Sequence, residues 1–228
     1  MPNNKLDHIA FILDGNKRWA KKNNYSKIDG YKKGFEKIKE VINLSLKIKL
    51  SNLTLFTLSS ENINRNSVKI IFEIIYKNFS ELIEQIALDK NIRIKIIGSK
   101  DKLPLKLINI LSQAEEITKN NKDLVLNLAF NYGFKDEINN VLKKIKQNIN
   151  KINIESDNEI RNFFYLGSTP DPEILIRTGG HKRLSNFIMY NLTYTELFFT
   201  DTLWPDFSEK EFIDIINKFS KIDRKYGL

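Results

Sequence analysis

The feature that most constrains the fold is an alternation of short β-branched runs with longer stretches of helical spacing. Runs typical of strands occur at 8–13, 53–58, 92–98, 124–130, 174–178 and 196–200. Helices are predicted at about 31–49, 67–89, 104–119, 134–149, 156–163, 185–191 and 208–224. This order predicts an α/β fold, in which a mostly parallel six-stranded sheet is flanked by helices on both faces.

Composition favours one domain spanning residues 1–228. No Pro/Gly/Ser-rich linker divides the 228 residues, and 41% of them are hydrophobic, enough for one substantial core. The absence of cysteine excludes disulfides and thiolate metal sites. No apolar run approaches the ~18 to 20 residues of a membrane span, and no signal-peptide core is found near the N-terminus. We expect a cytoplasmic protein, peripheral at most to the inner membrane face.

The net charge of +9 favours anionic partners such as nucleic acid, phosphorylated small molecules or an acidic membrane surface. Thirty of the basic residues are lysines, which suit a solvated surface, and only seven are arginines. Arginine binds phosphate with two parallel hydrogen bonds, which lysine cannot do. The arginines are therefore the more informative cations, and four of them fall in three polar segments: Arg18, Arg65, Arg177 and Arg183.

These three polar segments follow predicted strands, at 14–19, 59–65 and 177–185. Ligands of parallel sheets bind outside the carboxyl ends of the strands, so the segments are predicted to form one cationic cleft. The cleft would carry two carboxylates, Asp14 and Glu61. His181 lies between Gly-Gly and Lys-Arg and is expected near the ligand, whereas His8, at a strand start, is expected to be structural.

Asp14 begins the segment DGNKRWA, whose Gly-Asn-Lys-Arg suits a phosphate at a helix N-terminus. The chain has no G-x-x-x-x-G-K-[ST], no G-x-G-x-x-G and no Asp-Asp-x-x-Asp motif. A carboxylate beside a diphosphate is repulsive unless a hard cation lies between them, which predicts Mg²⁺. The alternative is that Asp14 caps the following helix, and Gly179-Gly180 could likewise be an ordinary turn.

The predicted helix 67–89 carries an apolar stripe broader than a surface helix needs. It either packs against the sheet or lines an apolar tunnel beside it. The stripe comprises Val68, Ile71, Phe72, Ile75, Phe79, Leu82, Ile83 and Ile86.

Five motifs in sequential order resemble the cis-prenyltransferases, and among these the bacterial enzymes that make undecaprenyl diphosphate. They are DGNKRWA at 14–20, SSENINR at 59–65, NYG at 131–133, IRTGG with RLSNF at 176–187, and ELFFTD with LWPDF at 196–207. The similarity runs from His8 to about Gly227, nearly the whole chain. It implies a homodimeric, Mg²⁺-dependent transferase that adds isopentenyl diphosphate in cis to a primer such as farnesyl diphosphate. The product would be a long polyprenyl diphosphate, the undecaprenyl carrier of cell-wall synthesis.

The resemblance also implies roles for residues of this chain. Asp14 would bind Mg²⁺ and assist departure of the diphosphate, Glu196 would be the second metal-side carboxylate, and Asn62 would accept the proton. Substrate would be bound by Gly15, Asn16, Lys17, Arg18, Trp19, Lys27, Tyr31, Ser59, Ser60, Glu61, Ile63, Arg65, Arg177, Arg183, Leu184 and Ser185. The broad apolar helix would line the product tunnel, and the apolar product implies contact with a membrane.

This chain departs from the family pattern at several positions. The family commonly has a small Gly or an Arg at the position of Lys17, and an Arg at the position of Lys27. A lysine keeps the charge of an arginine but loses its bidentate guanidinium fork. Tyr31 replaces a histidine and cannot act as a near-neutral acid. The family's Glu-His-Arg after Gly-Gly is His181-Lys182-Arg183 here, and Lys182 cannot ligate Mg²⁺.

Three other functions fit parts of the sequence. A cis-prenyltransferase with a different product length would keep the same chemistry. A non-catalytic partner subunit of such an enzyme would lack the aspartate and strand-end polar residues that this chain retains. A nucleic-acid-binding protein would interleave aromatic and basic residues, but here the aromatics lie mostly in apolar runs, so we expect no nucleic-acid partner.

Overall fold

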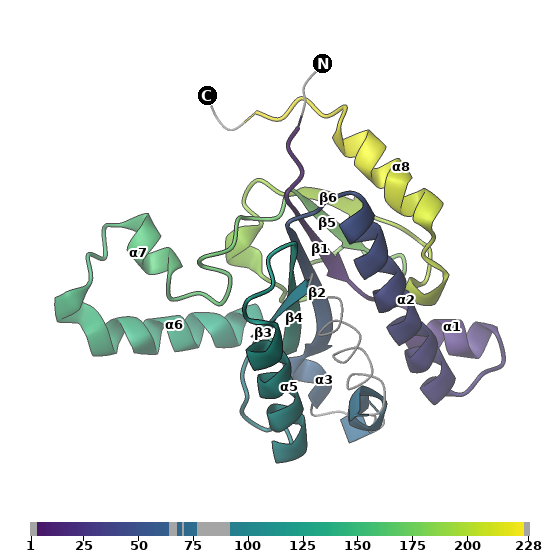
Figure 1. Cartoon of the computed structure of the whole chain (residues 1–228), viewed down its shortest axis with the longest axis horizontal. Coiled ribbons are helices and arrows are strands. Elements are labelled where there is room, and N and C mark those ends of the chain that lie inside the picture. The colour runs from purple at the N-terminus through teal and green to yellow at the C-terminus, as the bar shows by residue number, and fades with distance from the viewer. Residues whose placement is uncertain (1–3, 64–67, 70, 77–91, 226–228) are drawn as a thin grey trace.

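The structure is a computed structural model that describes residues 4–63, 68–69, 71–76 and 92–225. Six strands form one sheet in the order β3-β4-β2-β1-β5-β6, and every neighbouring pair is parallel (Figure 1). The strands are β1 (His8–Ile12), β2 (Asn52–Ser59), β3 (Ile92–Ile97), β4 (Leu124–Tyr132), β5 (Ile174–Arg177) and β6 (Glu196–Phe199). The predicted six-stranded α/β fold is confirmed.

The described helices are α1 (Asn16–Lys22), α2 (Lys27–Lys47), α3 (Ser60–Ile63), α5 (Leu105–Thr118), α6 (Phe134–Asn148), α7 (Asp157–Arg161) and α8 (Glu209–Phe219). Three 3₁₀ turns are η1 (Ile149–Lys151), η2 (Met189–Asn191) and η3 (Trp204–Asp206). Residues 68–69 and 71–76 are also helical, and the rest of the predicted helix 67–89 lies outside the described residues. In the described part of the chain, no helix is both long and apolar enough to cross a membrane.

Local backbone geometry explains two of the differences from the predicted helices. The helix expected from about residue 31 begins at Lys27, because Ser26 and Asp29 form a reciprocal capping box. The helix expected at 185–191 is reduced to the η2 turn. Ser185 and Asn186 adopt φ angles of +51° and +64°, which a right-handed helix cannot contain.

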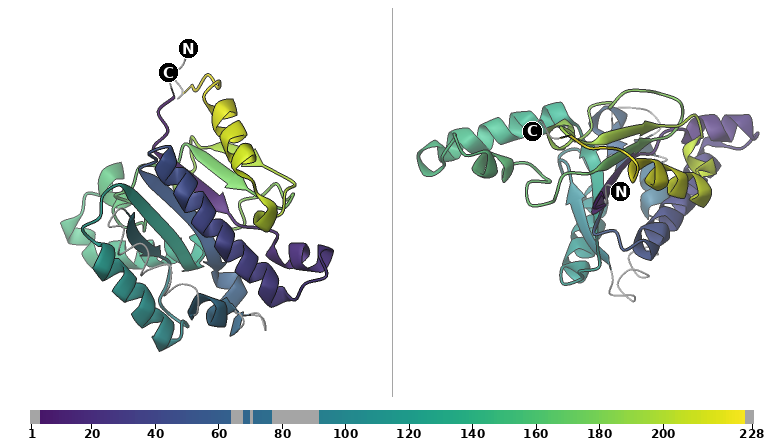
Figure 2. Two further views of the ribbon diagram at one scale, coloured as in Figure 1. Left: turned by 45° about the vertical axis from the view of Figure 1, so that its right-hand side comes forward. Right: turned by 90° about the horizontal axis from the view of Figure 1, so that it is seen from above.

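The two faces of the sheet are covered differently. Ile9 and Phe11 point into the larger core cluster, which α2, α5 and α8 complete (Figure 2, left). Ile12 points to the opposite face, where it meets Phe187 and Ile188 from the segment after β5. Irregular chain therefore supplies much of the cover on this second face, and α6 with α7 extends away from the body of the molecule (Figure 1).

A buried chain of polar side chains crosses the amino half of the sheet. The His8 ring is fully buried, with Nδ1 2.6 Å from the Pro170 carbonyl and Nε2 2.7 Å from the Thr54 hydroxyl. Because a carbonyl can only accept, Nδ1 carries the proton and Thr54 donates to Nε2. Asn127 in turn donates to Thr54 over 3.0 Å. Burial lowers the pKa of His8 to about 4, so the ring is neutral and structural, as expected.

Candidate active site

The polar segments after β1, β2 and β5 meet in a single cleft of about 770 Å³. Side chains of α1 and α2 and the first turn of α6 complete its walls. The predicted site residues that line the cleft are Asp14, Gly15, Asn16, Lys17, Arg18, Tyr31, Ser59, Glu61, Asn62, Arg177, Arg183 and Ser185, and His181 lines it as well. The carboxyl edge of the sheet thus gathers most of the residues selected from sequence.

Asp14, two residues beyond β1, lies between two guanidinium groups. Its Oδ1 is 3.0 Å from Arg18 Nη2, and its Oδ2 is 3.0 Å from Arg177 Nη2. Its backbone N–H donates to the Thr178 hydroxyl over 3.0 Å. The N-cap of α1 is Gly15, so the alternative of Asp14 as a helix cap does not hold. The Asp14 carboxylate is instead part of a charged cluster that opens to the cleft.

Arg177, the last residue of β5, is 3% exposed and makes directed hydrogen bonds with its guanidinium. Nη1 donates to the Ser185 hydroxyl over 2.6 Å and to the Arg183 carbonyl, while Nη2 donates to Asp14. Nε is buried and has no hydrogen-bond partner among the residues that the structure describes. Burial lowers the pKa of Arg177, an effect that Asp14 opposes and Arg183 and Arg18 reinforce. The fork is therefore held in one orientation at the base of the cleft.

The Gly179-Gly180 loop lets Arg18 approach the backbone closely. Gly179 has a φ of +82°, and a Cβ built on it would lie 2.5 Å from Arg18 Nη2 and 2.8 Å from the Asp14 carbonyl oxygen. Arg18 Nη1 donates to the Gly179 carbonyl over 2.6 Å. Any larger residue would displace this guanidinium, so the glycine pair is part of the site and not a simple turn.

The opposite wall comes from the end of β2 and from α3. The Ser59 hydroxyl accepts from the Asn62 backbone N–H over 3.3 Å, and Glu61 accepts from the Asn186 side-chain amide over 2.9 Å. The Asn186 amide oxygen accepts from the backbone N–H of Lys135, the second residue of α6, over 2.9 Å. Asn186 therefore ties together the wall, the loop after β5 and the start of α6.

Sequence reasoning missed Asn186 and Lys135, both of which line the cleft. Asn186 lies inside the RLSNF motif but was not selected, and its left-handed φ of +64° cannot be read from sequence. Lys135 follows β4 as Asp14 follows β1, so the strand-end rule could have found it.

Several residues expected at the site do not line the cleft. Trp19 donates its indole N–H to Asp206 over 2.6 Å and stacks on Tyr25. Lys27 is exposed at the start of α2 and does not line the cleft. Ser60, Ile63 and Leu184 do not line the cleft either. Arg65 lies outside the described residues.

Within one chain, Glu196 lies away from Asp14, the other carboxylate expected on the metal side. It is the first residue of β6 and pairs with Ile174 at the amino end of β5, whereas Asp14 follows the carboxyl end of β1. Its carboxylate lies 3.7 Å from Arg224. The acidic residue of this motif that does reach the loop after β5 is Asp201, whose Oδ1 would lie 3.1 Å from a Cβ on Gly180.

An apolar pocket of about 80 Å³ adjoins the polar cleft, and the two share Leu13, Asn16, Tyr31, Thr57 and Ile71 as lining residues. Its other walls come from α2, from the helical residues 71–76 and from β4. The remaining lining residues are Gly34, Phe35, Ile38, Ile74, Ile75, Leu128, Phe130 and Trp204. A ligand with a charged head and an apolar tail would match this pair of surfaces.

This two-part site suits a ligand with a charged head and an apolar tail, and comparison with known proteins gives the family. Residues 12–227 match the model described as putative undecaprenyl diphosphate synthase, so the chain belongs to the undecaprenyl diphosphate synthase family of prenyltransferases. Isoprenyl transferase of Aquifex aeolicus is 38% identical over 224 residues, covering 97% of this chain and 95% of the relative. That of Streptococcus pneumoniae strain R6 is 38% identical over 230 residues, covering 96% and 91%.

Solved structures agree with the family. Lavandulyl diphosphate synthase from Lavandula x intermedia, in complex with dimethylallyl diphosphate, superposes with a TM-score of 0.91 at 30% identity, covering 97% of this chain and 98% of that one. A probable undecaprenyl diphosphate synthase from Campylobacter jejuni gives a TM-score of 0.82 at 29% identity, covering 99% and 100%.

Proposed function

We propose that the protein condenses isopentenyl diphosphate with an allylic primer, farnesyl diphosphate, in cis configuration and with Mg²⁺, to make a long polyprenyl diphosphate. The observation that carries this proposal is the Asp14 carboxylate between Arg18 and Arg177, in a cleft that adjoins an apolar pocket. The cations suit the diphosphate of a substrate, and the apolar pocket suits its isoprenoid chain.

The donor set fits Mg²⁺ that arrives with a diphosphate. Among the described residues, no group of three or more His, Cys, Asp or Glu side chains could form a complete protein cage. Mg²⁺ commonly takes one or two carboxylates together with phosphate oxygens and water. Asp14 would supply the carboxylate, and Glu196 is too remote to share the ion within one chain. When bound, the ion neutralises charge that develops on the departing diphosphate.

Each side of the cleft has a separate task in the proposed reaction. The turn from Gly15 to Arg18 would hold the primer's diphosphate while the allylic C–O bond breaks and its electron pair leaves with the diphosphate. Arg177, already fixed by Ser185, would orient isopentenyl diphosphate so that its alkene attacks the carbocation. The adduct then loses a proton, for which Asn62 in the cleft wall is the proposed acceptor.

The apolar pocket supports a growing product. Burial of a methylene group contributes about 0.8 kcal/mol, so each five-carbon unit that enters an apolar tunnel gains about 4 kcal/mol. Ile71, Ile74 and Ile75 line the pocket from the helix in which sequence analysis expected a tunnel wall. We propose that the product reaches the length of the undecaprenyl carrier lipid of cell-wall synthesis, with shorter or longer chains as the alternative.

We also propose that the protein acts as a cytoplasmic homodimer in peripheral contact with the inner membrane face. An apolar surface supports self-association: Leu142, Ile149 and Ile154, on and after α6, are 59%, 49% and 57% exposed. Light scattering of the purified protein tests the dimer, and a monomeric mass across the concentrations used for activity would contradict it.

The function is tested by incubating the pure protein with labelled isopentenyl diphosphate, farnesyl diphosphate and Mg²⁺. Chromatography of the extracted lipid then gives the product length. We expect label in a long polyprenyl product and none when Mg²⁺ is chelated. Absence of label from the lipid would contradict the enzyme proposal, and a salt-dependent mobility shift with short RNA would then favour the nucleic-acid alternative.

A further inference from the structure

The α1–α2 corner, defined as residues 21–28 together with Lys32, is an unusually exposed part of the molecule. All eight residues from 21 to 28 are exposed. Among them, the apolar side chains Tyr25 and Ile28 are 58% and 41% exposed. Figures 1 and 2 show α1 and the start of α2 projecting from the body of the protein.

The apolar part of the corner rests on a fixed support. The ring of Tyr25 stacks on that of Trp19, with centroids 5.5 Å apart and planes 6° from parallel. Trp19 is held in turn by the hydrogen bond from its indole N–H to Asp206. Tyr25 is therefore presented to solvent on a rigid platform, with Ile28 at the start of the neighbouring helix α2. Rigid aromatic side chains of this kind favour the interface between water and lipid.

The charge around these side chains is strongly positive. Residues 15–35 contain seven Lys or Arg and one acidic residue, Asp29. Hydrogen bonds from Ser26 lower the pKa of Asp29, whose carboxylate is engaged in the helix cap. Lys21, Lys22 and Lys32 form no salt bridge with any residue that the structure describes.

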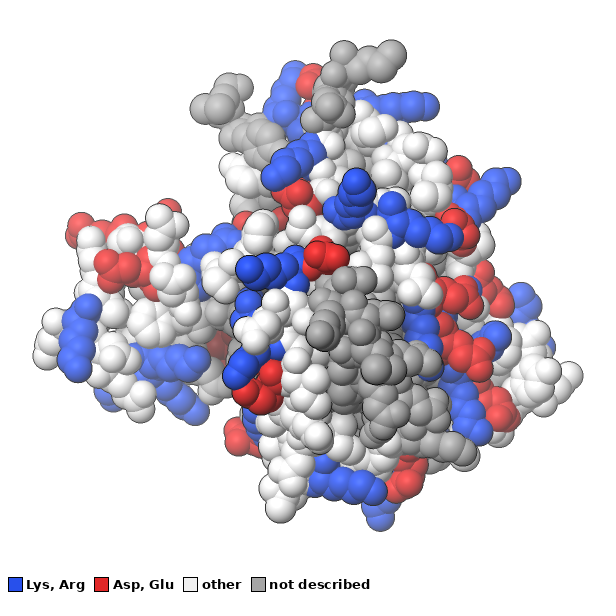
Figure 3. All heavy atoms as spheres, viewed as in Figure 1, with Lys and Arg blue, Asp and Glu red and all other residues white. Residues whose placement is uncertain are grey.

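Some other lysines of the molecule are paired with acidic residues. Lys33 pairs with Glu36 over 2.8 Å, and Lys37 and Lys119 pair with glutamates one turn away. Figure 3 shows blue and red side chains mixed over much of the visible face. The corner therefore combines exposed apolar side chains with lysines that have no salt-bridge partner among the described residues.

We propose that the α1–α2 corner is the surface by which this protein docks on a bilayer that contains anionic lipids. Tyr25 and Ile28 would enter the interfacial layer, and the lysines would contact lipid phosphates. A nucleic acid would use the lysines but would leave Ile28 without a partner, so a bilayer matches the surface better. Asn16, Lys17 and Arg18, at the other end of α1, line the cleft, so one short helix joins the corner to the cleft.

The test measures binding to sedimenting lipid vesicles without any substrate. We expect the full chain to bind vesicles of mixed phosphatidylglycerol and phosphatidylcholine, to bind pure phosphatidylcholine much less, and to dissociate as salt is raised. Because each lysine near an anionic surface contributes about fivefold to the partition coefficient, the Lys21→Gln/Lys22→Gln variant should bind about 25-fold more weakly. Tyr25→Ser/Ile28→Ser should bind about tenfold more weakly.

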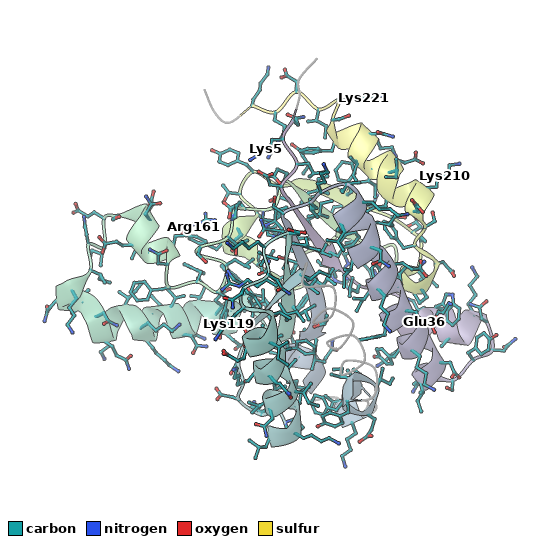
Figure 4. The ribbon with its side chains drawn as sticks, viewed as in Figure 1. Lys5, Glu36, Lys119, Arg161, Lys210 and Lys221 are labelled. Atoms are coloured by element: carbon teal, nitrogen blue, oxygen red, sulfur yellow. The ribbon has the colours of Figure 1, made fainter. Side chains whose placement is uncertain are left out.

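The matched control carries the same charge change at another surface. Lys210→Gln/Lys221→Gln alters exposed lysines on and after α8 (Figure 4). This variant should keep roughly half or more of the wild-type partitioning, because charges outside the membrane contact are largely screened. Thermal unfolding of each variant excludes misfolding. Equal binding by the corner variants and the wild type would overturn the proposal, as would an equal loss in the control. The proposal would also be overturned if the corner variants lost binding to single-stranded RNA but kept their binding to vesicles.

A separate assay distinguishes this proposal from the proposed enzyme function, on which it does not depend. Incorporation of isopentenyl diphosphate is measured in detergent solution, where no bilayer is present. Normal incorporation by corner variants that no longer bind vesicles would support docking as a distinct property. Failure of the wild type to incorporate label, with vesicle binding intact, would overturn the enzyme function and leave the docking surface standing.

Discussion

The two ends of the parallel sheet use similar polar residues in opposite ways. At the amino end, the Glu173 carboxylate accepts backbone N–H groups of Asp7 and His8 over 3.1 and 2.8 Å, and His8 is bonded at both ring nitrogens. At the carboxyl end, the buried Nε of Arg177 has no hydrogen-bond partner in the described part of the chain, and Asp14 faces an open cleft. Polar groups at the amino end are occupied by the protein itself, whereas those at the carboxyl end retain capacity for a ligand.

The difference shows that a buried or charged residue is informative about function only with its partners in view. His8 has a strongly lowered pKa and Arg177 a lowered one, and both result mainly from burial. Only Arg177 lines a cleft of ligand size. The same substitution made at each end of the sheet can therefore separate an effect on stability from an effect on activity.

The largest effect is expected for Asp14→Ala at the carboxyl end. Loss of the carboxylate that would hold Mg²⁺ should lower turnover at least ~100-fold. Glu173→Ala is the matched variant at the amino end. It leaves two backbone N–H groups unsatisfied and should lower the free energy of unfolding by about 2 kcal/mol with turnover unchanged. Steady-state kinetics and urea unfolding measure both, and near-normal turnover of Asp14→Ala would remove Asp14 from the mechanism.

Arg177→Lys should reduce kcat/KM for isopentenyl diphosphate about 50-fold, because lysine keeps the charge but loses the directed fork. The matched control is Arg161→Lys. Arg161, labelled in Figure 4, binds Asp171 with two hydrogen bonds of 2.7 and 3.1 Å and does not line the cleft. That variant should lose stability and keep its kcat/KM. Equal kinetic losses in both variants would contradict a binding role for Arg177.

The amino end should contribute a pH dependence of stability through His8. Its pKa is about 4 in the folded protein and about 6.5 in the unfolded chain, so the unfolded chain binds more protons between these values. The free energy of unfolding should therefore fall as the pH drops below about 6.5, by about 2 kcal/mol at pH 5. Urea unfolding of the wild type and His8→Gln at pH 8 and about pH 5 measures the difference.

Other groups titrate in the same range with the opposite sign. Burial raises the pKa values of Glu137 and Glu173, so both favour the folded state as the pH falls. They are unchanged in His8→Gln, and comparison with that variant isolates the His8 contribution. An identical pH slope in the two proteins would show that His8 does not titrate on unfolding.

The smallest effect is expected for Asn186, which joins the cleft wall to α6. Asn186→Gly tolerates the φ of +64° but loses the hydrogen bonds to Glu61 and Lys135, so turnover should fall about fivefold with little change in stability. Asn186→Ala adds backbone strain and should also lower the free energy of unfolding by about 1 kcal/mol. If Asn186→Gly keeps full turnover and Asn186→Ala does not, Asn186 acts only through its backbone conformation.

Sequence periodicity was sufficient to predict all six strands, because each strand is a short, largely apolar run followed by polar residues. The strand-end rule also predicted that the segments carrying Asp14 and Arg177 would meet. Within one chain, Glu196 and Asp14 lie at opposite edges of the sheet, because Glu196 begins its strand whereas Asp14 follows the end of its own.

Other features of the site depend on long-range contacts that no local pattern reports. The bond from Trp19 to Asp206 joins residues 187 positions apart. The left-handed conformations of Ser185 and Asn186, which replace the expected helix with a loop, directly precede Phe187, which is buried against the sheet. These features set the shape of the cleft, and only the three-dimensional structure reveals them.

The strand order has a consequence for how the chain is made. β1 lies at the centre of the sheet between β2 and β5, and the Asp14 and Arg177 side chains are 163 residues apart in the sequence. During synthesis, the first strand can pair early with β2, but its other edge must wait until β5 has left the ribosome. The charged cluster is therefore completed late in folding, and chains interrupted before β5 contain Asp14 without the arginine that orients it.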